Sequence, residues 1–337
     1  MTLPHAQVPP DVPRHITSRV SGGDKVFRVV VRGAGLTVLV ITGLILTFLL
    51  IRAWNAFKVM GFRFFTTRNF DVASTFSSKS NDFGVAALLA DGFIIAAIAL
   101  ILAIPIGVMT GLYISEYAPH RLRRALIAVI DLMAAIPSII YALWGLFFLM
   151  GRMTGLESWL ARHLAFLPIF HVTGAASALP AVFTDSPFVV GVVVSLMVIP
   201  IITSLTREFF SQAPQPEREA AYALGATRWG MVRTVVLPFG RAGIIGACLL
   251  GMGRALGDAV IISFLGSVLA VGAINSHVPQ SGVNSIPLQI LLHFTSGPTW
   301  VAALMAAGLV LFAVTLLINV LGSLITGRSR AGLVNVD

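Results

Sequence analysis

Long apolar runs divide this chain, and they constrain its fold more than any other feature. A helix needs about 20 mostly apolar residues to cross the hydrocarbon core of a bilayer, and a backbone inside the bilayer must satisfy its own hydrogen bonds. The sequence therefore predicts an all-α polytopic membrane protein with six transmembrane helices. Pro137 and Pro200 predict kinks in the third and fourth of them. The six runs cover residues 30–53, 85–114, 125–150, 187–206, 242–271 and 301–326.

The composition excludes a soluble enzyme with a single anchor. Charged residues make up 11% of the 337 residues, whereas a soluble domain carries about 25%. The net charge of +9 fits basic cytoplasmic loops rather than nucleic-acid binding, because no aromatic and basic recognition motif accompanies it. If the N-terminus is cytoplasmic, the inner segments hold most of the 23 lysines and arginines. We therefore expect both termini in the cytoplasm.

Polar sequence precedes the first run and separates it from the others. Residues 1–25 hold four prolines and too little apolar surface to order, so we expect a disordered cytoplasmic tail. Residues 26–54 are then a retained first transmembrane helix, and 55–84 an extracytoplasmic loop. The other five spans form a core over 85–327, followed by a short cytoplasmic tail at 328–337.

A charged segment, "EREAAYALGATRWGMVRTVVLP" at 217–238, lies between the fourth and fifth runs. Pro216 suits the first turn of a helix, Gly225 ends that helix, and Thr227 is placed to cap a second one over 228–236. Within the cytoplasmic loop 207–241 the sequence therefore predicts two short helices joined by a sharp corner. This pair of short helices with its corner at Gly225 is called the knob below. Such a shape suits insertion into a groove of a partner, and a plain amphipathic loop on the membrane surface is the alternative.

The spacing within this segment resembles the EAA motif of ABC importer permeases. That motif reads Glu-Ala-Ala, three residues, Gly, nine residues, Ile-x-Leu-Pro, and here Val235 replaces the isoleucine. The resemblance implies a type I ABC importer permease (MetI-like) fold and a coupling element that docks on an ATPase subunit. Since the chain has no G-x-x-x-x-G-K-[ST] motif, we expect no cofactor on this chain, and ATP and Mg²⁺ on the partner ATPase subunits. The residues that match the motif are Glu219, Ala220, Ala221, Gly225, Leu237 and Pro238.

Two charged residues, Arg254 and Asp258, lie near the middle of the fifth run. Each costs roughly 2.5–3.5 kcal/mol at the centre of a membrane helix. They are four apart, so one interpretation is a structural ion pair. The other is a path for an anion, in which the Arg254 guanidinium binds an oxyanion through two parallel N–H bonds. Ser263 and Ser138 are weaker candidates for the same path.

The stretch "GMGRALGDAVIISFLG" resembles the phosphate-specific permeases, and its Gly-x-Gly before the arginine resembles their PstC branch. "AIPIGVMTGLYISEYAP" (103–119) and "AAIPSIIYALWGL" (134–146) agree, so the resemblance covers roughly 85–327. It implies phosphate import across a bacterial inner membrane, with a PstA-like second permease, two ATPase subunits and an extracytoplasmic phosphate-binding protein. Asp258 stands where the family usually has glutamate, so a role that needs the longer side chain does not transfer.

Other functions fit the sequence less well. A permease for sulfate or molybdate shares the cytoplasmic motif but not the G-x-G-R-A-L-G-acid run, and a PstA-type subunit tends to have Ala-x-Ala before the arginine. An intramembrane aspartyl protease needs a second aspartate at the depth of Asp258, whereas Asp91 and Asp131 lie near opposite faces. An ion-coupled transporter predicts internal repeats, of which none is evident. We expect a solvated carboxylate at Asp91, no catalytic residue and no metal site.

Overall fold

The structure is a computed structural model of a chain that divides into two units, 1–48 and 49–337. A single helix, α1 (Gly22–Met60), crosses the boundary between them. The predicted tail over residues 1–25 lies almost wholly outside the described residues. These are residues 22–72, 82–170, 172, 183–266 and 278–334.

The second unit is built from helices and one small strand pair, in which β1 (Phe70–Asp71) pairs antiparallel with β2 (Asp82–Phe83). Short 3-10 turns (η1, Gly61–Phe65; η4, Pro168–Phe170) and π-helical turns (η2, Tyr113–Tyr117; η3, Gly145–Leu149; η7, Val232–Val236) link or end the helices. The helices are α2 (Ala86–Leu112), α3 (His120–Ala135), α4 (Ser138–Trp144), α5 (Met150–His163), α6 (Pro187–Ser211), α7 (Gln215–Ala223), α8 (Arg228–Met231), α9 (Leu237–Leu256), α10 (Val260–Leu265), α11 (Ile286–His293) and α12 (Pro298–Val334).

Six helical stretches are long and apolar enough to cross a membrane, which confirms the predicted number of spans. The third differs from the prediction, because the chain is broken at Pro137 rather than kinked there. Proline has no N–H and pushes the residue before it out of the helical region, and Ile136 is extended (φ −67°, ψ 126°). The six stretches are Gly22–Phe65, Ala86–Tyr117, Ser138–His163, Pro187–Ser211, Arg228–Leu256 and Pro298–Leu324.

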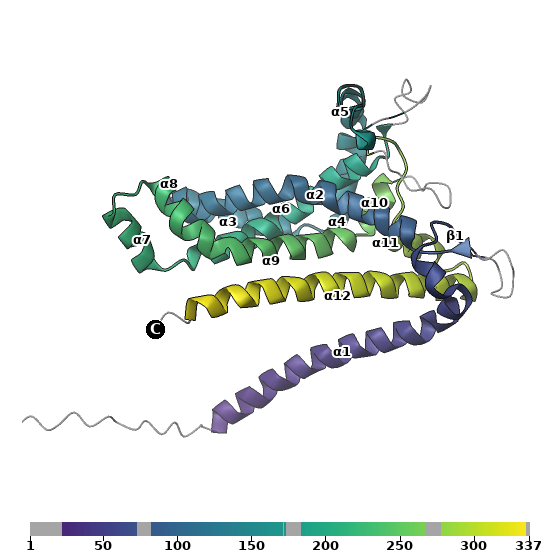
Figure 1. The fold of residues 1–337 in the computed structure, drawn as a ribbon, viewed down its shortest axis with the longest axis horizontal. Coiled ribbons are helices and arrows are strands. Elements are labelled where there is room, and N and C mark those ends of the chain that lie inside the picture. Colours follow the sequence, from purple (N-terminus) through teal and green to yellow (C-terminus); the bar gives the residue numbers. More distant parts are fainter. Residues whose placement is uncertain (1–21, 73–81, 171, 173–182, 267–277, 335–337) are drawn as a thin grey trace, which may run out of the picture. The chain divides into compact units, whose positions relative to one another are not determined.

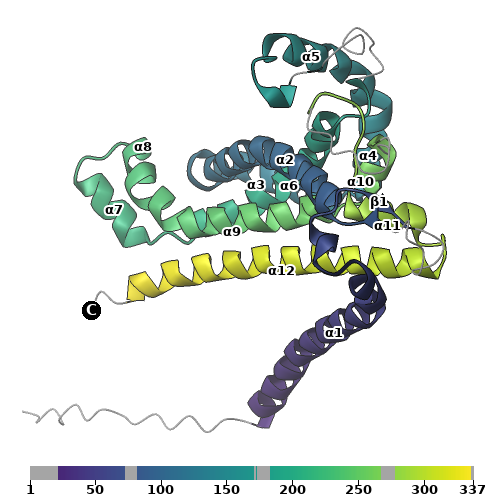
Figure 2. The same cartoon turned by 45° about the vertical axis from the view of Figure 1, so that its right-hand side comes forward.

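The centre of the second unit is the contact between α2 and α6. Glycines let the two backbones approach closely: a Cβ on Gly107 would lie 2.8 Å from Cγ2 of Ile202, and one on Gly191 would lie 2.6 Å from Cγ2 of Ile98. α9 packs on both helices, and α12 packs on α9. In Figures 1 and 2 these long helices run side by side, with α7 and α8 at one end and α10 and α11 at the other.

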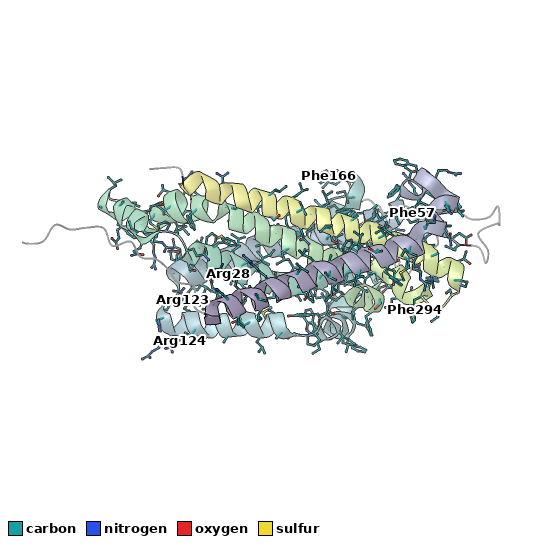
Figure 3. The ribbon with its side chains drawn as sticks, turned by 90° about the horizontal axis from the view of Figure 1, so that it is seen from below. Arg28, Phe57, Arg123, Arg124, Phe166 and Phe294 are labelled. Carbon is teal, nitrogen blue, oxygen red and sulfur yellow. The ribbon has the colours of Figure 1, made fainter. Side chains whose placement is uncertain are left out.

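Labelled side chains in Figure 3 mark the two ends of this axis. Arg123 and Arg124, near the start of α3, lie at one end of the second unit, and Phe57 and Phe294 lie toward the opposite end (Figure 3). α3 begins close after η2, so the arginines belong to the end that carries α7 and α8. Basic residues gather on the cytoplasmic side of membrane proteins.

Candidate functional site

An open cavity of about 610 Å³ lies where α9, α11 and α12 face one another. Most of its lining is apolar, and its polar side chains are those of Arg254, Thr315 and Asn319. Thr315 and Asn319 are four residues apart on α12, so they lie on one face of that helix. The lining residues are Leu49, Ile201, Leu250, Gly253, Arg254, Gly257, Ile290, Gly308, Leu311, Phe312, Thr315 and Asn319.

Arg254 is the charged residue of this cavity. It lies in the last turn of α9 and is exposed. Within the part of the chain that the structure describes, Glu116 and Arg218 form the one ion pair, so Arg254 has no acidic partner there. A guanidinium in apolar surroundings is costly unless an anion neutralises it. A guanidinium without an acidic partner is chemically able to bind an anion.

Asp258 has a different role from the one that its spacing predicts. The helix stops at Leu256 and restarts at Val260, so the fifth run is broken where the sequence predicts a continuous span. Asp258 is buried, and its Oδ1 accepts a hydrogen bond from the N–H of Ile261 (2.8 Å) in the first turn of α10. Of the two interpretations left open by the sequence, the structural ion pair is not observed among the described residues, because the break removes the helical geometry that it needs.

The structure does not bring the two predicted serines to this cavity. Ser263 Oγ donates to the carbonyl of Val260 (2.8 Å) on its own helix, and Ser138 begins α4 directly after Pro137. Sequence analysis missed Thr315 and Asn319 instead. Their signal was available, because they are polar residues four apart in an otherwise apolar run.

Asp91, expected to be a solvated carboxylate, is buried. Its exposed fraction is 1%, and its Oδ2 accepts a hydrogen bond from the N–H of Asn284 (3.2 Å). The Asn284 side-chain oxygen in turn accepts from Nε2 of Gln289 on α11 (3.0 Å). The expectation was wrong because the segment before α11 folds back over the start of α2. These hydrogen bonds join the start of α2 to α11 at the end of the unit that lies away from α7.

The predicted pair of short helices at the other end is confirmed. α7 ends at Ala223, Gly225 turns the chain with φ +84°, and Thr227 Oγ1 accepts from the N–H of Gly230 (3.1 Å) at the start of α8. A positive φ favours glycine, which explains why the corner falls at Gly225. α8 is shorter than predicted, because η7 continues it as a π-helical turn to Val236.

The corner presents the motif residues and three large side chains. Glu219 is exposed and accepts a hydrogen bond from Nε2 of Gln215 (3.1 Å), whereas Leu237 and Pro238 begin α9. Leu224, beside the corner, is 89% exposed, and Tyr222 and Trp229 are also exposed. Sequence analysis missed these three. The corner therefore exposes three large, mainly apolar side chains.

Known proteins resemble this chain over most of its length. Residues 103–330 match the family model of the binding-protein-dependent transport system inner membrane component. Phosphate transport system permease protein PstC 2 of Mycobacterium tuberculosis is 36% identical over 315 residues, which cover 92% of this chain and 94% of that protein. Phosphate transport system permease protein PstC of Mesorhizobium japonicum is 32% identical over 306 residues, which cover 88% and 87%.

Solved structures share the fold at low sequence identity. A chain of a bacterial ABC transporter involved in the import of the acidic polysaccharide alginate matches with a TM-score of 0.55 at 19% identity. The match covers 91% of this chain and 98% of that chain. At this identity the likeness establishes the ABC permease fold alone.

Proposed function

Since the chain belongs to the family of binding-protein-dependent transport system inner membrane components, we propose that it is the permease subunit of an ATP-driven importer of inorganic phosphate. It is a multi-pass inner membrane protein and a transport subunit, not an enzyme. The observation that carries the proposal is Arg254, an exposed guanidinium without an acidic partner among the described residues, in a mostly apolar cavity.

Phosphate is the oxyanion that the observations favour. The run around Arg254 matches the phosphate-specific permeases, and the relatives at 32–36% identity are named phosphate transport system permeases. An arginine alone accepts any tetrahedral oxyanion, because its paired N–H groups recognise geometry and charge. Sulfate and molybdate are therefore outcomes that the experiment must distinguish.

The proposed assembly follows from surfaces that this chain leaves open. The Arg254 cavity is open on one side, and we assign the missing wall to a PstA-like second permease. The exposed knob at Gly225 is assigned to an ATPase subunit, one of two in the complex, which bind ATP and Mg²⁺. An extracytoplasmic phosphate-binding protein delivers the anion at the opposite end. This arrangement requires cytoplasmic N- and C-termini.

Within the knob, we propose that the six motif residues have separate tasks. Glu219 and Ala220 are exposed on α7 and are assigned to the contact with the groove on the ATPase subunit, where the small Ala220 side chain allows close approach. Ala221 packs against the apolar cluster around Phe210 and holds α7 in place behind that contact. Gly225 fixes the corner. Leu237 and Pro238 start α9, so a push on the knob passes along the helix whose last turn carries Arg254.

The experiment is uptake of radiolabelled phosphate by cells that lack their own phosphate importers and express the complete complex. We expect uptake that unlabelled phosphate suppresses and that equal sulfate or molybdate leaves unchanged. If sulfate or molybdate suppresses the uptake at the same concentration, that oxyanion rather than phosphate is the substrate. No uptake of any of the three anions would remove the proposal.

A further inference from the structure

The described residues contain one ion pair, and it ties the knob to a membrane helix. Arg218 Nη1 of α7 donates to Glu116 Oε2 at 2.8 Å, and Glu116 belongs to η2, the π-helical turn that ends α2. The side chains are 16% and 4% exposed, respectively. Exposed ion pairs contribute little, but breaking a buried pair leaves an uncompensated charge. This pair is therefore a strong link between α7 and α2.

Arg218 also binds the end of a second membrane helix. Its Nη2 donates to the carbonyl of Phe210 at 2.6 Å, and its Nε donates to the carbonyl of Ala213 at 3.2 Å. Carbonyls at a helix C-terminus lack partners within the helix and carry partial negative charge, so a guanidinium there satisfies and stabilises them. One side chain of α7 thus binds the ends of both α2 and α6.

A second arginine completes the arrangement from the other side of the glycine corner. Arg228 of α8 donates to the backbone carbonyl of Glu116, and its guanidinium lies over the Tyr117 ring, 4.8 Å from the ring centre. π-helical turns often occur at functional sites, because their wider turn frees carbonyls for other donors. Both helices of the knob are therefore fastened to η2.

Little else holds α7 in place. None of its residues is fully buried, whereas α8 and η7 contribute Met231, Val232 and Val236 to an apolar cluster with Phe210. Apolar packing thus positions α8 and η7, whereas α7 contributes only the partly buried Ala221 to that cluster and depends more on its polar contacts. These four residues, Glu116, Tyr117, Arg218 and Arg228, are called the η2 clamp below.

We propose that the η2 clamp is a positioning device, through which displacement of α7 by the ATPase subunit moves α2 and α6 as one body. The proposal rests on the proposed function, since it assigns the receiving end of the same transmission. α2 and α6 form the packed centre of the unit, and α9, which carries Arg254, packs on both. Without the clamp the knob still docks and still pushes on α9 through η7, but α2 and α6 no longer move together with α7.

The test compares Glu116→Gln with wild type in proteoliposomes that contain the complete complex and its binding protein. Phosphate import and ATP hydrolysis are measured in the same vesicles. We expect the ATPase subunits to co-purify normally and hydrolysis to continue, while phosphate imported per ATP hydrolysed falls about tenfold, or about 1.4 kcal/mol. An unchanged ratio of phosphate to ATP would overturn the proposal.

Matched controls are Glu208→Gln and Arg124→Gln, which remove exposed charges at the same end of the molecule. Both should keep the wild-type ratio of phosphate imported to ATP hydrolysed. A lower ratio in either variant would overturn the special role of the clamp. If Glu116→Gln fails to assemble, the double variant Glu116→Leu with Arg218→Met replaces it, since removing both charges leaves none unpaired. It should assemble and remain uncoupled, and normal coupling would contradict the proposal.

A further readout separates this inference from the choice of phosphate as cargo. A wild-type complex that hydrolyses ATP but imports no phosphate refutes the proposed function only. Stimulation of ATP hydrolysis by the binding protein then tests the clamp, because that signal crosses the same contacts in the opposite direction. We expect the stimulation to disappear in Glu116→Gln and to persist in Glu208→Gln, and stimulation retained in Glu116→Gln would overturn the clamp.

Discussion

The arginines of the η2 clamp and of the Arg254 cavity differ in whether they have fixed partners. Arg218 has a buried carboxylate and two backbone carbonyls as partners. Arg254 has no acidic partner among the described residues, and even Asp258, four positions away, bonds to the backbone of α10 instead. The difference separates two uses of charge in a membrane protein. Charge whose partners are fixed holds helices together, whereas charge left open is available to a mobile anion.

The largest effect should follow from removing the open charge. Arg254→Gln keeps a polar side chain but loses the charge and the paired N–H groups. Hydrogen bonds to charged groups contribute about 1.5–3 kcal/mol each, so phosphate uptake should fall about a hundredfold or more. Uptake of labelled phosphate in cells is the measurement, with Arg124→Gln as the control that removes an exposed arginine outside the cavity. Normal uptake by Arg254→Gln would remove the anion site.

The next effect tests the surface that the knob presents. Leu224 is 89% exposed, and burying a leucine contributes about 1.5–3 kcal/mol. Leu224→Asp should therefore weaken binding of the ATPase subunit at least about tenfold, as measured by co-purification from solubilised membranes. Gln212→Glu adds the same charge at an exposed position before the knob and should bind normally. Equal binding by the two variants would show that Leu224 is not at the interface.

A smaller effect tests the corner itself through two glycines that differ in backbone conformation. A Cβ would meet no atom within 4 Å at either Gly225 or Gly151, but Gly225 has φ +84° and Gly151 lies in α5. Gly225→Ala should lower stability by about 1 kcal/mol, because alanine strains the left-handed conformation. Gly151→Ala should raise it by a similar amount. Thermal unfolding of the purified protein measures both, and shifts of the same sign would contradict the account.

The smallest effect concerns Asp258. Asparagine keeps a side-chain oxygen that can accept from the Ile261 N–H, so Asp258→Asn should keep both stability and uptake near wild type. Asp258→Ala removes the acceptor for the Ile261 N–H and should cost about 1 kcal/mol of stability. The measurements are the thermal unfolding midpoint and the phosphate uptake of each variant. Loss of uptake in Asp258→Asn would give the charge of Asp258 a role on the anion path.

Local features of this fold were predictable from the sequence, and contacts between distant segments were not. Apolar length predicts six spans, and Gly225 and Thr227 predict the corner of the knob, because each depends on neighbouring residues only. The break after Leu256 falls at Gly257, and glycine also occurs inside continuous membrane helices, so the residue alone did not predict the break. Glu116 and Arg218 are 102 residues apart in the sequence, so nothing local pairs them. Spacing suggested a pair at Arg254 and Asp258, and tertiary structure formed one elsewhere.

The central claim is that the knob receives movement and that Arg254 binds the anion, as separate tasks. The most direct measurement takes ATPase co-purification and phosphate uptake from one membrane preparation of Arg254→Gln. We predict full recovery of the ATPase subunits together with uptake reduced about a hundredfold. Loss of the ATPase subunits in step with uptake, or uptake at the wild-type rate, would contradict the account.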